Sequence, residues 1–295
     1  MINKGKLAIV NIKGGFGNQL FQFSLANYLK GNGFNVFADL EYFSFFEKNE
    51  NFEDTKRKLV IPIEYFNLDI ISKSKKLLFS FFNNIVNNRY FNLITKSKFK
   101  KYIVVQKGNI FNKAKVGTWT LFDGYWKNIE IIEYSKNYII ESICNNKTIE
   151  QGFKNRIDPG STLLHVRRGD FLNHNRELTE NFYKKSLSIA REKIKNFNYE
   201  IFTDDYDWVI SHSFFSDAKN IYPQQSTDDD IKETIDTFSQ MLNFDNYIVG
   251  NSAYSLWAAL LSSNNESLVI VPDPWFRHDD HPVLKRKNWI TVENN

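Results

Sequence analysis

Short apolar runs alternate with segments of helical spacing along most of the chain. The first run covers residues 7–12, and it leads through a glycine-rich turn into an apolar segment that ends near Gly31 and Gly33. Residues 36–40 form a second run. Short apolar runs bounded by turn residues predict buried strands, and apolar residues at helical spacing predict helices. The chain is therefore expected to begin with a strand, a turn, a helix and a second strand.

The same alternation returns downstream and is most regular in the second half. A strand is predicted to begin at residue 117, and a helix is predicted at residues 128–144. Further strands are predicted at residues 162–166, 199–203, 219–222, 247–249 and 268–271, with helical segments between them. Strands that alternate with helices are typical of parallel sheets. The pattern therefore predicts an α/β protein, although residues 41–115 are hard to assign.

A polar stretch at residues 145–160 separates the two halves. It contains Asp158-Pro159-Gly160, a turn sequence of the kind found at domain boundaries. Each half begins with an apolar strand and a specialised turn. We predict two Rossmann-like domains with parallel sheets facing a cleft, residues 1–155 and residues 156–295. The last helix or tail can cross back to the first domain.

Composition narrows the class of protein. The 295 residues include 38 Lys and Arg against 34 Asp and Glu, a net charge of +4, which suits an anionic small ligand but not nucleic acid. The single cysteine, Cys144, excludes an internal disulfide and a cysteine-based metal site. No secretory signal and no apolar run of about 18 residues is apparent, so a cytoplasmic protein is expected.

Residues 73–99 mix basic and aromatic side chains. One interpretation is a face that lies on anionic lipid, which would make the protein peripheral at the inner membrane. The other is a solvated pair of helices with the phenylalanines packed inward, because no clean amphipathic pattern is visible.

The turn after the first strand carries a partial dinucleotide-binding pattern. Gly15-Phe16-Gly17 is followed by Leu20 where a third glycine would be needed, and no Gly-Lys-Ser/Thr is present in this turn. Asn18 adds a side-chain amide at the start of the helix. The turn either approaches a ligand through its backbone or simply meets a need for tight geometry between strand and helix.

The strand beginning at Thr162 ends in His165, Arg167, Arg168 and Asp170. Ligands of α/β proteins bind outside the carboxyl ends of strands, and guanidinium groups there suit phosphate. The alternative is that both arginines pair with surface carboxylates. Because neighbouring strand residues point to opposite faces, we expect one arginine in the site and one bonded to its neighbours.

Several motifs together resemble the bacterial galactoside α-1,2-fucosyltransferases of glycosyltransferase family 11. The resemblance extends over about residues 7–290, and residues 41–115 lack a marker. The motifs are GGFGNQLFQ at 14–22, GYW at 124–126, HVRRGD at 165–170, FTDD at 202–205, GNSAYSLWAA at 250–259 and VPDPW at 271–275. The HVRRGD motif is shared with other fucosyltransferases, so it indicates GDP-fucose more than a linkage.

This resemblance implies a GT-B fold with the donor held mainly by the second domain. It implies inverting transfer of L-fucose from GDP-L-fucose to O2 of a terminal β-galactoside, in the synthesis of a bacterial surface glycan such as O-antigen or capsule. No metal and no cofactor other than the donor are expected. The alternatives are another fucose linkage, another nucleotide sugar, or a nucleotide-sugar or glycan-binding protein without turnover.

The same resemblance gives roles to the candidate residues. Arg167 is the first candidate for the β-phosphate and Arg168 the second, because a metal-free transferase stabilises its leaving group with cations and amides. His165 either bonds a phosphate or the sugar, or is a core histidine. Asn18 matches a position that contacts the donor in related enzymes, and Gly15, Phe16 and Gly17 would let the backbone approach it.

Other candidates follow the neighbouring strands. Asp204 could bind guanine or ribose, and Asp204-Asp205 also resembles a metal-binding Asp-x-Asp motif. Asn251, Ser252 and Ser255 begin a helix, where they could bind phosphate or, for Ser252, only cap the helix. Asp170 is the preferred base for the acceptor hydroxyl, ahead of His174 and Glu177. It could instead only hold Arg168 or its own turn.

Overall fold

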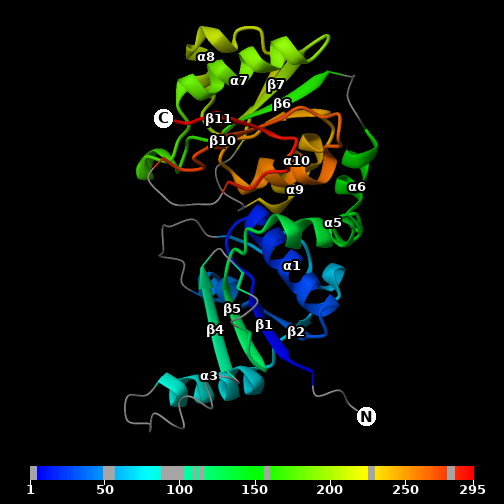
Figure 1. The fold of residues 1–295 in the computed structure, drawn as a ribbon, viewed down its shortest axis with the longest axis vertical. Coiled ribbons are helices and arrows are strands. Elements are labelled where there is room, and N and C mark those ends of the chain that lie inside the picture. The colour runs from blue at the N-terminus through cyan, green and yellow to red at the C-terminus, as the bar shows by residue number, and fades with distance from the viewer. Residues whose placement is uncertain are drawn as a thin grey trace. The chain divides into compact units, whose positions relative to one another are not determined.

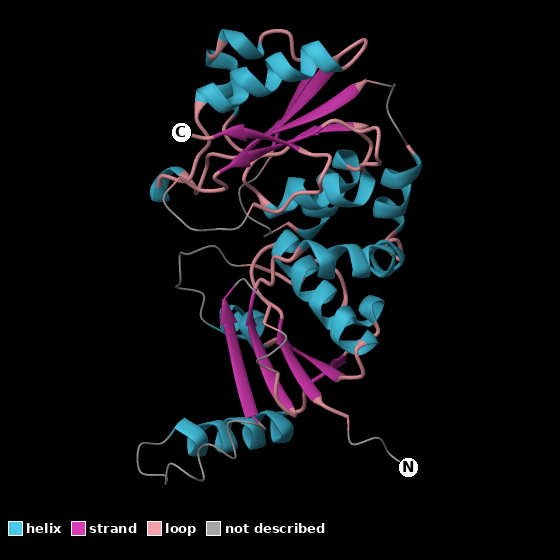
Figure 2. Ribbon diagram, in the orientation of Figure 1, coloured by secondary structure: helices cyan, strands magenta, loops and turns pink. Residues whose placement is uncertain are grey.

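A computed structural model describes most of the chain. The described residues are 5–48, 57–87, 103–108, 111–112, 116–155, 160–224, 230–277 and 283–295. They divide into two compact units, residues 1–142 and residues 143–295, and Figures 1 and 2 show a sheet with helices in each. Asp158-Pro159 and residues 88–99 of the basic aromatic segment at residues 73–99 lie outside the described residues.

The first unit contains a five-stranded sheet in the order β3-β2-β1-β5-β4, and every pairing is parallel. Its strands are β1 (Leu7–Asn11), β2 (Asn35–Asp39), β3 (Asp69–Ile70), β4 (Ile103–Gly108) and β5 (Trp119–Gly124). Its helices are α1 (Phe16–Gly31), α2 (Glu41–Lys48), the 3₁₀ helix η1 (Ile63–Phe66), α3 (Lys73–Asn87) and α5 (Ile129–Ile143).

The second unit contains a six-stranded parallel sheet in the order β11-β10-β9-β6-β7-β8. Its strands are β6 (Ser161–Val166), β7 (Asn198–Thr203), β8 (Asn220–Pro223), β9 (Asn246–Ile248), β10 (Val269–Asp273) and β11 (Ile290–Glu293). Its helices are α6 (Lys147–Lys154), α7 (Glu180–Lys193), α8 (Tyr206–Ser211), α9 (Ile231–Met241) and α10 (Ala253–Ser262), with 3₁₀ helices η3 (Leu172–His174) and η4 (Ser213–Phe215). Counted from β6, this is the strand order 3-2-1-4-5-6 of a dinucleotide-binding sheet.

Burial explains why these sequences form strands and helices. Every residue of β6 is buried, as expected for a central strand of a parallel sheet covered on both faces. Helix α7 packs Tyr183 and Leu187 into the core of the second unit. The Thr179 side chain accepts a hydrogen bond from the Phe182 backbone and so begins that helix.

The predicted fold class, α/β with two parallel sheets, is confirmed, and the cleft stays a prediction. The sequence missed α2, β3, β4, α6 and β11. The compact units place α6 in the second unit, whereas the sequence-based boundary at residue 155 places it in the first. Strand β11 pairs with β10, so the described end of the chain belongs to the second unit. None of the described helices is both long and apolar enough to span a bilayer.

Candidate functional site

The candidate site lies where the chain order of the second sheet reverses. From β6 the chain continues to β7 on one side, and it returns later as β9 on the other side. Ligands of open α/β sheets bind outside the carboxyl ends of the strands at such a reversal. The residues after β6 include Arg167 and Asp170, those after β7 include Asp204, and those after β9 include Asn251. The predicted site residues of this domain therefore share one edge of the sheet.

Arg167 is held between two carboxylates. Its Nη2 donates to Asp170 Oδ1 at 2.7 Å, and its Nη1 lies 3.0 Å from Asp204 Oδ2. The guanidinium carbon also lies 5.4 Å from the centre of the Phe171 ring. These contacts fix the plane of the guanidinium, and the Arg167 side chain keeps 15% of its surface exposed. Asp170 thus holds Arg167, which is not the pairing with Arg168 that the sequence left open.

Arg168 has a different set of partners. Its backbone N–H donates to Asp204 Oδ1 at 2.7 Å, and its Nε donates to Asp205 Oδ2 at 3.0 Å. Its guanidinium carbon lies 4.1 Å from the centre of the Trp208 ring. Asp205 also begins helix α8 by accepting a hydrogen bond from the Trp208 backbone. These contacts anchor Arg168 to the start of α8.

His165 is buried inside the second unit. Its Nδ1 lies 2.9 Å from Ser255 Oγ, a hydrogen bond that joins β6 to helix α10. Gly250 leaves room for the ring, because a Cβ there would lie 2.9 Å from the His165 carbonyl oxygen and 3.0 Å from Nδ1. Burial, with a further contribution from the Arg167 charge, lowers the pKa of His165 to about 3. The imidazole is therefore neutral near pH 7.

The start of α10 contains two more predicted residues. Ser252 accepts a hydrogen bond from the Tyr254 backbone at 3.3 Å and so caps the helix. Asn251 is buried and donates from Nδ2 to the Arg176 carbonyl oxygen. Within the described part of the chain, its buried Oδ1 accepts no hydrogen bond.

The carboxylates near Arg167 differ in their access to solvent. The Asp204 side chain is only 1% exposed, whereas the Asp170 side chain is 32% exposed. Glu177 forms an ion pair of 2.8 Å with Arg277, which follows β10. His174, in η3, is exposed. Of the two carboxylates that hold Arg167, Asp170 is the one that solvent reaches.

No group of three or more His, Cys, Asp or Glu in the described ranges is arranged to hold a metal ion. Asp204 and Asp205, which resemble a metal motif in the sequence, each bind an arginine. These ion pairs, and the stacking of Arg168 on Trp208, were not predicted from the sequence. The strand order would have revealed the ion pairs, because β6 and β7 are parallel neighbours whose carboxyl ends lie side by side.

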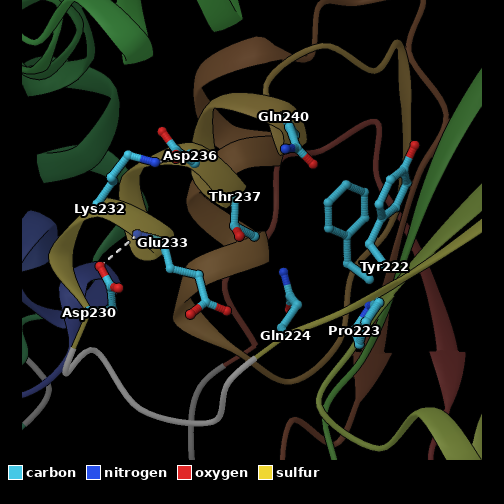
Figure 3. Close-up of a pocket in the computed structure, with 10 residues that line it drawn as sticks. Tyr222, Pro223, Gln224, Asp230, Lys232, Glu233, Asp236, Thr237 and Gln240 are labelled. Carbon is cyan, nitrogen blue, oxygen red and sulfur yellow. Dashed lines mark hydrogen bonds and ion pairs between the residues drawn. The ribbon is translucent and has the colours of Figure 1, made fainter.

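A cavity of about 360 Å³ opens at the same edge of the sheet, between the ends of β7 and β8 and helix α9. Figure 3 shows the Tyr222 ring at one wall, with Glu233 and Thr237 extending from α9. The Phe202 ring stacks on Tyr222, with the ring centres 4.7 Å apart and the ring planes inclined by 27°. The remaining lining residues are Pro223, Gln224, Asp230, Lys232, Asp236 and Gln240. This cavity was not predicted from the sequence.

The glycine turn of the first unit follows β1. Gly14 has a φ of +76°, and a Cβ there would lie 3.1 Å from Asn18 Nδ2 and 3.3 Å from the Tyr125 ring. Gly15 precedes α1, which begins with Phe16 and Gly17. Because the Phe16 ring is buried, only its backbone can approach a ligand. The conformationally demanding glycine is therefore Gly14, outside the predicted set.

Two buried amides brace this turn. Gln22 accepts from the Lys13 backbone at 2.8 Å and donates to the Gly124 carbonyl oxygen at 3.1 Å, which ties the end of β1 to the end of β5. Gln19 donates to the Gly14 carbonyl oxygen at 2.9 Å. The amide-rich sequence after Gly17 thus fixes the turn from inside, while Asn18 is half-buried beside it.

Comparison with known proteins identifies the family. The sequence profile of glycosyl transferase family 11 matches residues 4–293. The chain belongs to this family. An α-1,2-colitosyltransferase of Escherichia coli is 25% identical, over 97% of this chain and 99% of that protein. The O-antigen biosynthesis glycosyltransferase WbnK of Escherichia coli is 26% identical, over 95% of this chain and 99% of its own length.

Two solved structures with a similar trace were determined with a guanine nucleotide. The α-1,6-fucosyltransferase NodZ, soaked with GDP-fucose, aligns with a TM-score of 0.42 and 15% identity, over 87% of this chain and 92% of NodZ. A mutant of Arabidopsis thaliana FUT1 in complex with GDP aligns with a TM-score of 0.46 and 8% identity, over 90% of this chain and 70% of that chain. The sequence-based assignment to family 11 is confirmed by the profile, and the chain is a glycosyltransferase.

Proposed function

We propose that this glycosyltransferase transfers L-fucose, with inversion, from GDP-L-fucose to O2 of a terminal β-galactoside of a bacterial surface glycan. One observation carries the proposal. In a family 11 chain, Arg167 stands at the strand-order reversal of a dinucleotide-binding sheet, with its guanidinium oriented by two carboxylates. The similarity to an O-antigen glycosyltransferase supports the choice of a surface glycan.

The diphosphate of the donor would bind beside Arg167 and the start of α10. As the bond to the sugar breaks, negative charge grows on the β-phosphate, and a fixed cation stabilises that charge without reorganising. The amino end of a helix adds partial positive charge and N–H donors. Arg167 is accordingly proposed as the catalytic cation, and the backbone N–H of Arg168 as the group that positions it through Asp204.

The other predicted residues take supporting places. Neutral His165 would act through Ser255 by fixing the start of α10, and the Asn251 amide would be the nearest side-chain ligand there. Asp204 is too buried to bind guanine or ribose directly and would serve as the counter-ion of Arg167. Gly15, Gly17 and Asn18, in the first unit, stay candidates for contact with the donor.

The guanine base would bind in the cavity between β7, β8 and α9. Its aromatic wall of Phe202 and Tyr222 suits a purine ring, since bases stack on aromatic side chains. The edge of guanine presents adjacent N–H donors, and a carboxylate such as Glu233 accepts such donors. A Glu233→Gln variant should raise the KM for GDP-fucose. An unchanged KM would place the base elsewhere.

Asp170 would deprotonate the acceptor hydroxyl. Of the two carboxylates that hold Arg167, it alone is accessible, and general bases typically contribute about 10²–10⁴-fold to a rate. The Asp170→Asn variant should therefore lose at least about 100-fold in kcat. A Glu177→Gln variant should retain most of the parental kcat. An Asp170→Asn enzyme with near-parental kcat would exclude Asp170 as the base.

Transfer of colitose is a second candidate, because the chain is similar over almost its full length to a colitosyltransferase. Colitose is L-fucose without its 3-hydroxyl group. A site that hydrogen-bonds this hydroxyl rejects the deoxy sugar strongly, whereas a purely apolar site does not. The ratio of kcat/KM for the two GDP-sugars would therefore assign the donor.

The deciding experiment incubates the protein with GDP-L-fucose and a panel of β-galactosides in excess chelator, then determines the linkage of the product by NMR. We expect acceptor-dependent release of GDP, undiminished by chelator, and an α-1,2 linkage. Binding of GDP-fucose without acceptor-dependent release would indicate a binding protein. A product with a different linkage would still identify the protein as a fucosyltransferase, but it would contradict transfer to O2 of the galactoside.

A further inference from the structure

Helix α3 of the first unit exposes apolar side chains. Leu77, Leu78 and Phe81 are 70%, 49% and 60% exposed, and Ile70, just before the helix, is 54% exposed. Leu77 and Phe81 are four residues apart and Leu78 and Phe81 three apart, so the three lie on one side of the helix. We name these three residues the outer face of α3. Large apolar side chains exposed together on a surface indicate a site of interaction with a protein or a membrane.

The opposite side of α3 is already packed. Phe79 belongs to a core cluster with Ile71 of the preceding loop and Ile103 of β4. Lys75 Nζ lies 4.1 Å from the centre of the Phe37 ring, and Lys76 Nζ forms an ion pair of 2.5 Å with Asp39. Figure 1 shows α3 across the end of the sheet at which β4 and β5 begin. The outer face is therefore not needed to attach the helix to the sheet.

The stretch of sequence that contains α3 is basic. Between Asp69 and Asp123 the chain has no acidic residue, and it has 11 lysines and arginines. That local charge exceeds the net +4 of the whole chain, so the rest of the molecule is acidic overall. Lys73 is exposed and lies one turn before Leu77, on the same side of the helix. Apolar side chains and lysines thus share one surface.

We propose that the outer face of α3, with Lys73, docks on an anionic lipid bilayer. Leu77, Leu78 and Phe81 would enter the boundary between head groups and acyl chains, and the lysines would contact lipid phosphates. A second copy of the chain is a poor occupant, because pairing two copies of this face would bring their exposed Lys73 ammonium groups together. An anionic bilayer matches both kinds of side chain, since its surface offers negative charge to the lysine and the hydrocarbon just beneath accommodates the apolar side chains.

The test uses the full-length protein and sedimentation with vesicles of phosphatidylcholine, with and without phosphatidylglycerol. We expect binding only where phosphatidylglycerol is present, and weaker binding at high salt. Replacing Leu77, Leu78 and Phe81 together by serine should reduce the partition coefficient at least about tenfold. Lys73→Glu should reduce it about fivefold or more, since each lysine near an anionic surface contributes about a factor of five.

The matched control is Ile210→Ser, which removes an equally exposed apolar side chain from α8 of the second unit and should not alter vesicle binding. Absence of binding by the unmodified protein, or equal binding by the triple variant, would overturn the proposal. Loss of a dimer in the triple variant, without any vesicle binding by the parent, would identify a second copy as the occupant. Transfer to a soluble acceptor should proceed at the parental rate in the triple variant, which separates this test from that of the enzyme activity.

Discussion

At the residue scale, the site is organised by the ion pairs of one arginine. Arg167 meets Asp170 and Asp204 on two sides, so its guanidinium is oriented before any nucleotide arrives. A preorganised cation stabilises developing charge without a cost of reorganisation during the reaction. The contribution of Arg167 should therefore be to kcat more than to folding.

Arg167→Ala should lower kcat/KM for GDP-fucose by about 10²–10³-fold, the usual loss when one charge-stabilising donor is removed. Arg167→Lys should recover little, since an ammonium group cannot span both carboxylates as a planar fork does. The measurement is steady-state release of GDP, with circular dichroism to verify folding.

Arg191→Ala is the matched control for Arg167. Arg191 lies in the same unit and pairs with Asp217 at 2.8 Å, but it is exposed on α7 and should alter kcat/KM less than twofold. A folded Arg167→Ala enzyme with near-normal kcat/KM would remove Arg167 from the mechanism.

His165 predicts how stability depends on pH. In the unfolded chain the His165 imidazole takes up a proton below about pH 6.5, whereas in the folded chain it does so only near pH 3. The free energy of unfolding therefore decreases as the pH falls from about 6.5 to about 3. Between pH 6.5 and pH 5 the loss from this residue should be about 2 kcal/mol.

Urea unfolding at pH 7 and pH 5 measures this change in the free energy of unfolding. His165→Asn should be less stable than the parent at pH 7, yet it should lose about 2 kcal/mol less between the two pH values. Equal losses in both proteins would show that His165 takes up its proton without unfolding.

Candidate site residues were predictable where several of them follow one another at the end of a strand. His165, Arg167 and Asp170 do lie at one edge of the sheet, as the sequence indicated. The partners of the arginines were not predictable from spacing alone, because Asp204 and Asp205 belong to the next strand and meet the arginines only through the β6–β7 pairing. Gly14 was overlooked because the motif pattern directed attention to Gly15 and Gly17.

At the element scale, the sequence failed where few residues of an element are buried. Helix α6 buries only Ile149 and Gly152, so no apolar stripe marks it within a polar stretch. Strand β3 is two residues long and exposed, which leaves no strand signal. Regular, deeply buried elements such as β6 and β7 were predicted within one residue at each end.

Gly152 is the contact point of α6. A Cβ there would lie 2.5 Å from the Ser239 carbonyl oxygen and 2.7 Å from Ser239 Oγ, on helix α9. Alanine is favoured over glycine in a helix by about 1 kcal/mol, but overpacking against a backbone oxygen costs about 1–3 kcal/mol. Gly152→Ala should therefore be destabilising on balance.

The measurement is thermal or urea unfolding beside Gln151→Ala, an exposed neighbour in the same helix that should change stability by less than about 0.5 kcal/mol. A Gly152→Ala protein more stable than its parent would mean that α6 does not press on α9 in solution.

At the scale of the whole molecule, the two parallel sheets and their separate cores were predictable, since strand and helix alternate along the chain. The boundary was harder to place. The polar residues before Gly160 suggested a linker, yet α6 lies within them and packs on α9, where Ser239 Oγ donates to the Thr148 carbonyl oxygen at 2.6 Å.

Two fragments distinguish the boundaries. Residues 143–295 retain α6 and should unfold cooperatively and bind GDP with a Kd within about tenfold of the whole protein. Residues 156–295 lack α6 and should melt at least about 5 °C lower, because one side of α9 becomes exposed. Equal melting temperatures would favour the boundary at residue 155.

The carboxylates around Arg167 have a consequence for the end of the catalytic cycle. An arginine without internal counter-ions would retain a spent diphosphate tightly, and product departure would then limit turnover. In the proposed site, Asp170 and Asp204 form ion pairs with the Arg167 guanidinium again as the nucleotide leaves. We expect this exchange of anions to keep GDP a weak product inhibitor, and removing the Asp170 charge to make it a stronger one.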